Sequence, residues 1–511
     1  MDHYYTAMRI FFLLILTLLS FSPPARAADD VGAAARGVVR VVTVAMVDGE
    51  VVGFGHGSGV AVSPTRIVTN AHVVESAVRY PANVAVGVVP SEGQKSFAAR
   101  LVAVDARRDL ALIELTEGRV PFATIYTGPV AAGLDVVALG YPGNVDLASA
   151  RSANDYILPR APVRSEGDVS AVQAVQGVAT LLHTANIARG NSGGPLVDAC
   201  GRVIGINSFM TRADEGDAGF AFAVAARELT SFLAEARQSY NAIGTACVSL
   251  AEAEARDRAA READAAAERA VAADRDAVSA AELKQRERAG AEAALTAREN
   301  RLALATVLLV LGAMAAGTGW IWNREGNRRA RLVLGAAALL VLAAAGVFAT
   351  RPSLVASTPA TPGNDEPIKV ATGAVPTGKR LCTLRPERSR ITVSKGDDVP
   401  IDLSATGCVN GRTQYAPGAD GGWTRAFVPA DDASVGIATL AADGASYRVE
   451  RWYPDGATLA KLRALRGGEA GQCAANRDAL ARLAATQEAI RAALPDPPNE
   501  RLVYDCVRAA N

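Results

Sequence analysis

Two long apolar runs constrain this chain more than any other feature. One is Leu302–Trp322 and the other is Leu332–Ala349, and neither contains a charged residue. Their lengths, about 21 and about 18 residues, suit helices that cross the ~30 Å hydrocarbon layer of a membrane. We therefore expect two transmembrane helices, with a buried helical hairpin as the alternative. Small residues in the runs would let the helices pack closely, namely Ala313, Gly317 and Gly335.

The loop between the two runs, residues 323–331, is basic. It carries Arg324, Arg328, Arg329 and Arg331. Short loops rich in Lys and Arg stay on the cytoplasmic side of a membrane, and Trp side chains such as Trp320 and Trp322 favour its interface. We therefore expect this loop in the cytoplasm and both flanking parts of the chain outside it.

Residues 1–27 have the pattern of an export signal. Arg9 precedes an apolar run from Ile10 to Phe21, and a small-x-small sequence ends at Ala27. The apolar run has about 12 residues, whereas a membrane span needs about 20. We expect cleavage after Ala27, with an uncleaved signal anchor as the alternative.

Six cysteines follow this segment: Cys200, Cys247, Cys382, Cys408, Cys473 and Cys506. An even number in an exported chain suits disulfides, and none lies in the C-x-x-C spacing of zinc sites. We expect pairs within domains, with free buried thiols as the alternative. The pairs predicted are Cys200–Cys247, Cys382–Cys408 and Cys473–Cys506.

Residues 28–245 contain short segments rich in Val, Ile and Leu that are separated by Gly, Pro and Asp. This spacing predicts an all-β sandwich or barrel. One amphipathic helix follows, with apolar residues at Leu229, Phe232 and Leu233. Residues 246–301 are rich in Ala, Glu and Arg and predict a helical stalk. We expect the stalk to be solvated or weakly paired as a coiled coil, which leaves room for self-association through it.

Residues 350–378 read as a Pro/Ser/Thr linker. Residues 379–511 predict a small α+β domain, with strands first, including a hairpin around Asp443–Gly444, and helix last. Lysine plus arginine (53) equals aspartate plus glutamate (53), so charge gives no reason to expect a nucleic-acid partner. The fold class is therefore multidomain: an all-β domain, a stalk, a membrane hairpin and an α+β domain.

Three residues supply the parts of nucleophilic catalysis. Ser192 lies in "GNSGGP", His72 in "IVTNAHVV" and Asp109 in "ARRDLALIEL", each at the end of an expected element. Acyl transfer to serine needs a base and a carboxylate that orients it. Asp105 is the alternative carboxylate, and Ser192 as a plain turn residue is the alternative to a nucleophile. The other histidines have expected structural roles, in a loop for His56 and in packing for His183.

The motifs "GSGVAVS", "TNAHVV", "RDLALIEL", "GNSGGPLVD", "GRVIGINS" and "GFAFAV" resemble those of trypsin-like serine endopeptidases of the HtrA type. The resemblance implies two perpendicular six-stranded β-barrels with the site in the cleft between them. It implies that His72 is the general base, Asp109 its orienting carboxylate and Ser192 the nucleophile. The backbone N–H groups of Gly190 and Ser192 would form the oxyanion hole. The resemblance ends at Ala236, where the stalk follows instead of a PDZ-like domain.

The same resemblance indicates substrate-binding residues. Asn186 would lie at the floor of the primary pocket, where no carboxylate is present to pair a Lys or Arg side chain. Phe220 would line a wall of that pocket. The strand that begins Ile206, Asn207, Ser208 would pair with the extended substrate backbone. Neither a metal nor a cofactor is expected.

These features predict a membrane-anchored serine endopeptidase that hydrolyses envelope proteins through an acyl-enzyme. We expect it in a bacterial inner membrane, with the protease and C-terminal domains facing the periplasm. Its partners would be protein or peptide substrates and the lipid bilayer. The alternative is an envelope sensor or scaffold, whose C-terminal domain binds a ligand and whose protease domain acts rarely or on itself.

Overall fold

The computed structural model describes residues 29–149, 152–211, 219–350, 377–394, 396–418, 421–467, 473 and 477–508. The expected signal peptide, residues 1–27, and most of the expected linker, residues 350–378, lie outside the described residues and stay predictions. The chain divides into two compact units. One comprises Met1–Arg258 with Ala371–Asn511, and the other comprises Ala259–Val370.

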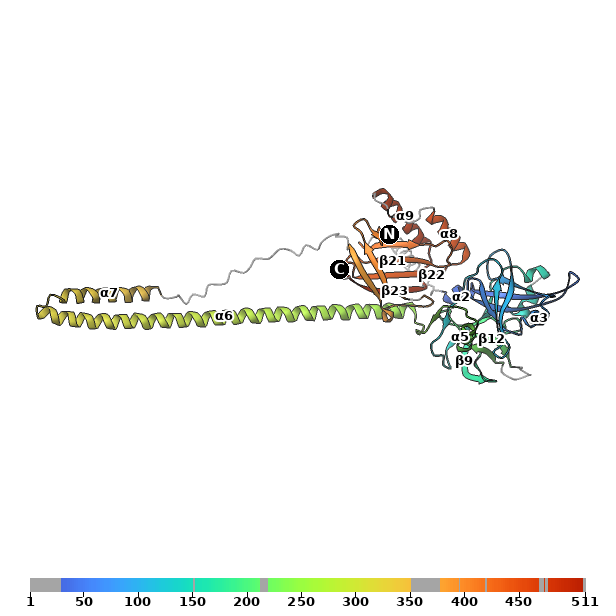
Figure 1. Cartoon of the computed structure of the whole chain (residues 1–511), viewed down its shortest axis with the longest axis horizontal. Coiled ribbons are helices and arrows are strands. Elements are labelled where there is room, and N and C mark those ends of the chain that lie inside the picture. The colour runs from blue at the N-terminus through green and yellow to red at the C-terminus, as the bar shows by residue number, and fades with distance from the viewer. Residues whose placement is uncertain are drawn as a thin grey trace, which may run out of the picture. The chain divides into compact units, whose positions relative to one another are not determined.

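A closed barrel of antiparallel strands begins the first unit (Figure 1). In barrel order its strands are β1 (Val38–Val47), β2 (Glu50–Ser63), β3 (Arg66–Thr69), β6 (Leu110–Leu115), β5 (Phe97–Asp105) and β4 (Val84–Pro90). Side chains alternate between the two faces of a strand. On β6, Ala111 and Ile113 fill one core, whereas Leu110 and Leu112 join a second core shared with later strands.

A second ring of strands follows in the chain. It runs through β8 (Asp135–Gly140), β9 (Val163–Val175), β10 (Val178–His183), β13 (Ala221–Ala225), β12 (Val203–Met210) and β11 (Pro195–Asp198). The ring is closed because β11 pairs with both β8 and β12. Two short strands, β7 (Ile125–Tyr126) and β14 (Ala242–Ile243), extend from β12. The expectation of two six-stranded barrels is confirmed.

Short helices accompany the barrels: α2 (Asp30–Ala35), α3 (Glu75–Arg79), α4 (Gly143–Ser149), the 3-10 turn η1 (Ala153–Tyr156) and α5 (Ala226–Glu235). The predicted helix is α5, and its residues Leu229, Phe232 and Leu233 are buried in the core that the two barrels share. This apolar face explains why α5 forms and where it packs.

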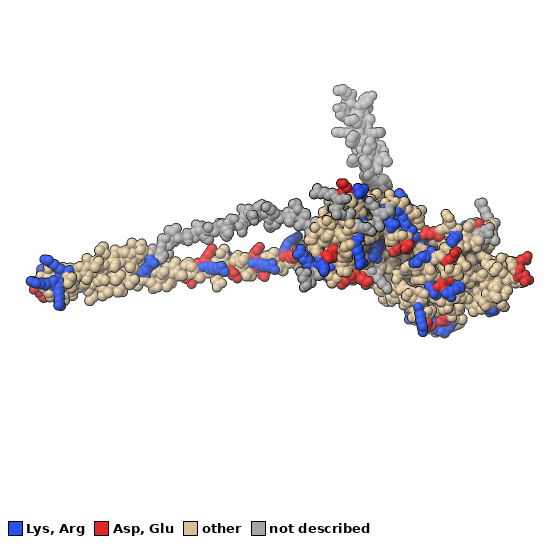
Figure 2. Space-filling model, turned by 45° about the horizontal axis from the view of Figure 1, so that its top comes forward, with Lys and Arg blue, Asp and Glu red and all other residues tan. Residues whose placement is uncertain are grey.

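The second unit contains most of α6 and all of α7, the helices expected from the apolar runs. α6 (Leu250–Arg324) is continuous from the expected stalk through the first run, and α7 (Ala330–Ala349) covers the second. Both are long and apolar enough to cross a membrane, by length and composition. Figure 2 shows an uncharged stretch on these helices, between the basic loop and the charged part of α6. The stalk and the first span therefore belong to one helix.

The glycines at the contact between α6 and α7 differ from those predicted. A Cβ added to Gly312 or to Gly319 would lie 3.0 Å from a side chain of α7. A Cβ added to Gly317 or to Gly335 would have no atom within 4 Å. The prediction for Gly317 and Gly335 is wrong, and Gly312 and Gly319 permit the close approach instead.

The described part of the C-terminal domain is one antiparallel sheet that curls into a nearly closed barrel. In sheet order its strands are β18 (Thr413–Gln414), β17 (Cys408–Val409), β16 (Val399–Leu403), β15 (Gly378–Leu384), β23 (Glu500–Arg508), β22 (Ser446–Trp452), β21 (Val435–Leu440), β20 (Trp423–Phe427) and β19 (Ala416–Pro417). A 3-10 turn, η2 (Pro386–Arg388), follows β15. The helices α8 (Gly456–Arg466) and α9 (Arg477–Ala493) share a core with Trp452 of the sheet.

The order of elements in this domain differs in part from the prediction. The expected hairpin around Asp443–Gly444 joins β21 to β22. The expectation that the domain ends in helix is wrong, because the chain returns after α9 as β23, between β15 and β22. Leu502, Tyr504 and Cys506 alternate along β23 and are all buried, which is the pattern of a strand.

All six cysteines form disulfides, which pair Cys200 with Cys247, Cys382 with Cys506, and Cys408 with Cys473. The first pair agrees with the prediction, and the other two stay within the C-terminal domain as expected. The predicted pairs Cys382–Cys408 and Cys473–Cys506 are wrong. Cys382 on β15 lies directly opposite Cys506 on β23, so strand pairing joins residues that are 124 positions apart.

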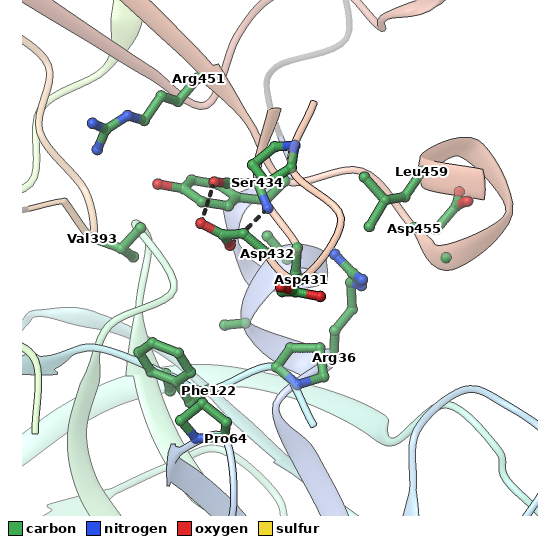
Figure 3. A pocket seen from close by; sticks show the side chains of 18 of the residues that line it. Arg36, Pro64, Phe122, Val393, Asp431, Asp432, Ser434, Arg451, Asp455 and Leu459 are labelled. Carbon is green, nitrogen blue, oxygen red and sulfur yellow. Dashed lines mark hydrogen bonds between the residues drawn. The ribbon is translucent and has the colours of Figure 1, made fainter. Parts of the chain in front are cut away.

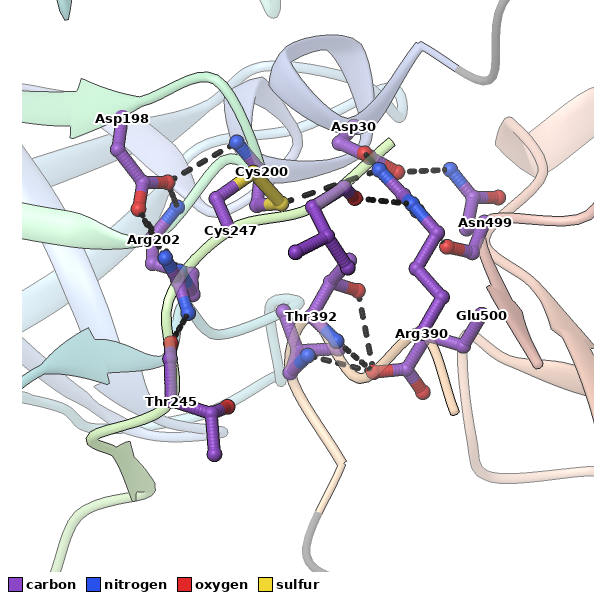
Figure 4. Close-up of a disulfide and its surroundings, with 12 residues drawn as sticks. Asp30, Asp198, Cys200, Arg202, Thr245, Cys247, Arg390, Thr392, Asn499 and Glu500 are labelled. Carbon is purple, nitrogen blue, oxygen red and sulfur yellow. Dashed lines mark hydrogen bonds and ion pairs between the residues drawn. A yellow bond between two sulfur atoms is a disulfide. The ribbon is translucent and has the colours of Figure 1, made fainter. Parts of the chain in front are cut away.

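The C-terminal domain and the barrels are linked by buried polar contacts (Figure 4). Arg390 donates to Oδ2 of Asp30 at 2.6 Å, and Asn499 donates to Oδ1 of Asp30 at 2.7 Å. Arg390 also donates to the carbonyl oxygen of Val248, beside the Cys200–Cys247 disulfide. Further ion pairs join Arg388 to Asp257 and Arg501 to Glu254. Residues before and near the start of α6 are therefore packed against residues that follow α7 in the sequence.

Candidate active site

The candidate base, His72, lies in the turn that follows β3. Its Nδ1 is 3.0 Å from Oδ1 and 2.9 Å from Oδ2 of Asp109, and its backbone N–H donates to Oδ1 at 3.1 Å. Asp109 stands directly before β6 with a φ of 54°, a conformation uncommon outside glycine. The His72 side chain is 48% exposed, so a substrate can reach it.

The carboxylate of Asp109 is prepared to accept hydrogen bonds. Burial raises the pKa of Asp109. Hydrogen bonds from His72 and Ser208 lower it by more than burial raises it, so the pKa lies below its ordinary value. The hydroxyl of Ser208 donates to Oδ2, and the amide of Asn70 donates to the backbone oxygen of Asp109. An ionised Asp109 accepts a hydrogen bond from the N–H at Nδ1 of His72, which leaves Nε2 as the acceptor of the neutral ring.

The candidate nucleophile, Ser192, lies in the loop between β10 and β11. In the described part of the chain its hydroxyl donates to the carbonyl oxygen of Ser208 at 3.0 Å and makes no hydrogen bond to His72. Ser208 thus contacts both Ser192, through its backbone, and Asp109, through its side chain. The three residues predicted for catalysis therefore converge around one position of β12.

Two N–H groups of the same loop are candidate donors to an oxyanion. Within the described residues, neither the N–H of Gly190 nor that of Ser192 donates a hydrogen bond. Gly190 has a φ of 98°, and an added Cβ would lie 2.3 Å from the carbonyl oxygen of Tyr141, so only glycine fits there. Two free N–H groups beside a serine hydroxyl are the donors that an oxyanion requires.

The residues predicted to bind substrate lie in different environments. Ile206 and Asn207 are fully buried in β12, and Ser208 is 5% exposed. Asn186 is exposed, and Phe220 is half-buried beside residues 212–218, which lie outside the described residues. Ile206 lies between Pro195 of β11 and Val224 of β13 in the sheet, and the backbone N–H and carbonyl of Asn207 bond to Gly194 and Gly193. Their role, like those of Asn186 and Phe220, stays a prediction.

Asp105, the alternative carboxylate, pairs with Arg108 at 2.7 Å instead of with a histidine. His183 is buried as expected for a packed residue, and that burial lowers its pKa to about 4. The expectation of a loop position for His56 is wrong, since His56 pairs with Val42 in the β1–β2 ladder. Burial lowers the pKa of His56, although the nearby Asp146 acts in the opposite direction.

Three residues make contacts at this site that the sequence analysis did not predict. Asn70 and Ser208 fix Asp109, and Ser58 touches the loop that carries Ser192. Ser58 belongs to the quoted motif "GSGVAVS", and Asn70 to "TNAHVV", so the sequence contained a signal for both. Their contacts depend on which strands are neighbours, and a motif alone does not give that information.

A large cavity lies elsewhere in the first unit, between the first barrel and the C-terminal sheet (Figure 3). Its volume is about 1740 Å³, and its walls include Arg36, Pro64 and Phe122 on one side and Val393, Asp432 and Arg451 on the other. Neither His72, Asp109 nor Ser192 lines it. The cavity therefore adds nothing to the candidate active site.

Comparison with known proteins finds similarity for one part of the chain. Residues 57–206 match the trypsin-like peptidase domain. The serine protease Rv3671c of Mycobacterium tuberculosis is 31% identical over 194 residues, which cover 38% of this chain and 45% of that protein. The periplasmic serine endoprotease DegP of Escherichia coli is 31% identical over 186 residues, or 35% of this chain and 36% of that protein.

A third relative is the magnetosome formation protease MamE of Paramagnetospirillum magneticum. It is 32% identical over 187 residues, which cover 35% of this chain and 23% of that protein. The chain thus spans less than half the length of these curated relatives. The family match, residues 57–206, lies within the part of the chain that forms the two barrels.

Proposed function

We propose that this chain, whose residues 57–206 form a trypsin-like peptidase domain, is a membrane-anchored serine endopeptidase with both folded domains in the periplasm. The observation that carries the proposal is the contact of His72 with Asp109, together with Ser192 and two N–H groups that have no hydrogen-bond partner among the described residues. The substrates proposed are proteins of the bacterial envelope. The relative DegP is named as a periplasmic protease, which agrees with this location.

The proposed reaction begins when the hydroxyl of Ser192 turns from the carbonyl oxygen of Ser208 towards Nε2 of His72. His72 takes the proton as Oγ bonds to the carbonyl carbon of the substrate peptide. The N–H groups of Gly190 and Ser192 hold the negative oxygen that results. His72 then gives its proton to the leaving amine, and water hydrolyses the acyl-enzyme by the same steps.

A fluorophosphonate probe tests the proposed nucleophile. In the full chain in detergent, Oγ of Ser192 should bond to the phosphorus of the probe, and fluoride should leave the probe. The reaction is possible because a neutral His72 accepts the serine proton. Mass spectrometry of the labelled peptide gives the site. Ser192→Ala and heat-denatured protein should both stay unlabelled. A sensor or scaffold with an inert serine would stay unlabelled when native, and that result would contradict the proposal.

The proposed topology is supported by the packing of the first unit. The contact between Asp30 and Arg390 supports a location of the barrels and the C-terminal domain on the same side of the membrane. α6 and α7 provide two candidate crossings between them, with a basic loop at residues 323–331. Disulfides on both sides of that hairpin suit an oxidising compartment. A periplasmic position for both domains satisfies all of these observations.

Reporter fusions test this topology. Alkaline phosphatase fused after Asn511 should be active, because that enzyme folds only outside the cytoplasm, and β-galactosidase fused there should be inactive. The matched control is fusion after Gly326, in the basic loop, where the two reporters should behave in the opposite way. Active β-galactosidase after Asn511 would contradict the proposed topology.

A further inference from the structure

Ser58, a residue of β2 with no exposed surface, contacts the loop that carries the candidate nucleophile. Its Oγ donates to the carbonyl oxygen of Gly190 at 2.6 Å and accepts from the N–H of Tyr141 at 2.9 Å. Its backbone N–H donates to the carbonyl oxygen of Ser192 at 2.8 Å. Ser58 therefore connects the first barrel to the two residues whose N–H groups are proposed to bind the oxyanion.

The carbonyls of the residues on either side of Gly190 are held by backbone donors. The carbonyl oxygen of Arg189 accepts from the N–H of Gly143 at 2.7 Å, and that of Asn191 accepts from the N–H of Gly194 at 3.0 Å. The C=O and N–H of a trans peptide point in opposite directions. Fixing the carbonyls of Arg189 and Asn191 therefore turns the N–H groups of Gly190 and Ser192 to the other side of the loop.

The hydroxyl of Ser58 holds the carbonyl of the peptide between those two, whose N–H, on Asn191, donates to the carbonyl oxygen of Ala188 at 3.0 Å. Gly190 has a φ of 98° and no side chain, so its own backbone torsions are not restricted by a Cβ. Without Oγ of Ser58, the carbonyl of Gly190 and the N–H of Tyr141 would each lose a partner in a buried place. A buried polar group without a partner is unfavourable, and rotation of the Gly190 peptide would relieve it.

We propose that Ser58 is a positioning residue, which holds the Gly190 carbonyl so that the N–H groups of Gly190 and Ser192 face the substrate oxygen. The inference rests on the proposed endopeptidase function. It differs from a purely structural role of a buried serine, because positioning affects the transition state more than substrate binding. A structural role would change the stability of the protein and leave the turnover of the folded fraction unaltered.

The test is the Ser58→Ala variant of the full chain in detergent, assayed on a peptide substrate. We expect kcat to fall by about 10- to 100-fold, less than the roughly 100- to 1000-fold loss typical for removing an oxyanion donor itself. KM should change by less than about threefold, since the hydroxyl does not touch substrate. Binding of a peptide boronic acid, whose oxygen occupies the oxyanion site, should weaken by a factor similar to the loss of kcat.

A matched control is Thr180→Val in the second barrel. Thr180 is also a buried hydroxyl that donates to a backbone carbonyl, that of Gln173, but it has no contact with the loop. Its kcat and boronate affinity should stay within about twofold of wild type, because the oxyanion donors are unaffected. Equal losses of kcat in Ser58→Ala and Thr180→Val would overturn the inference, as would wild-type kcat in Ser58→Ala.

If Ser58→Ala does not fold, Ser58→Cys carries the same test, because a thiol is similar in size and donates only weakly. A lower kcat with unchanged KM supports positioning, and a wild-type kcat overturns it. Ser192→Ala separates this inference from the proposed function. If Ser192→Ala retains activity, the endopeptidase proposal fails. If Ser192→Ala is inactive but Ser58→Ala has the kcat of wild type, the inference about Ser58 fails and the endopeptidase proposal stands.

Discussion

The Ser192→Ala variant should hydrolyse casein at least about 10⁴-fold more slowly than the wild-type chain, since loss of the nucleophile removes the covalent route. His72→Ala should cost about as much, because no other group described near Ser192 can take its proton. The double variant should be no slower than either single one, since the three residues act as one unit. Initial rates with a fluorogenic casein measure all three variants.

Ser170→Ala is the matched control for this result. Ser170 is an exposed residue of β9 that lies outside the candidate site, so its removal should leave the rate unchanged. Unfolding curves should show that Ser192→Ala keeps the stability of wild type. If Ser192→Ala hydrolysed casein at the wild-type rate, the activity would belong to another group or to a contaminant.

Much of the barrel fold could be predicted from the sequence because its signals are local. Leu110–Leu115 is a short apolar run broken only by Glu114, which is typical of a strand buried on both faces, and its residues do contribute to two cores. The motifs around His72, Asp109 and Ser192 gave the candidate triad in its chain order. The structure adds that Asp109 is held by Ser208 and Asn70, from two other segments of the chain.

The contacts that could not be predicted join segments far apart in the chain. Cys382 and Cys506 are close only because β23 returns to the centre of a sheet whose other strands precede α8 and α9. Nearness in sequence therefore suggested the wrong partners. Ser58 is similar: its motif was visible, but its contact with Gly190 depends on how one barrel packs against the other.

The buried ion pair between Asp30 and Arg390 should be the strongest single link between the C-terminal domain and the barrels. The Arg390→Met variant should lower the free energy of opening this interface by about 3–5 kcal/mol, because it leaves the Asp30 carboxylate buried with Asn499 as its only described side-chain partner. Both side chains are nearly inaccessible, at 7% and 5% exposure, so solvent screens the pair weakly. Hydrogen exchange at the amides of α2 and residues 499–501 measures this opening.

The effect of Arg390→Met should depend on pH. Burial already raises the pKa of Asp30, although Arg390 and Asn499 act in the opposite direction, and loss of Arg390 should raise it further. An acid whose pKa is higher in the folded than in the unfolded state gains stability as pH falls through the folded value. The difference between Arg390→Met and wild type should therefore shrink as the pH falls from 7 towards 4.

A double-mutant cycle separates this charge effect from the loss of packing. Asp30→Asn alone should cost less than Arg390→Met, because Arg390 would still donate to the carbonyl oxygens of Val248 and Asn499. Asp30→Asn combined with Arg390→Met removes both charges. The free energy of opening that hydrogen exchange measures for this double variant should return to within about 2 kcal/mol of wild type. If the double variant is instead as unstable as the sum of the single ones, the pair is not coupled and the link lies elsewhere. Recovery would show that the residues just after the expected signal cleavage site hold the C-terminal domain through a paired charge.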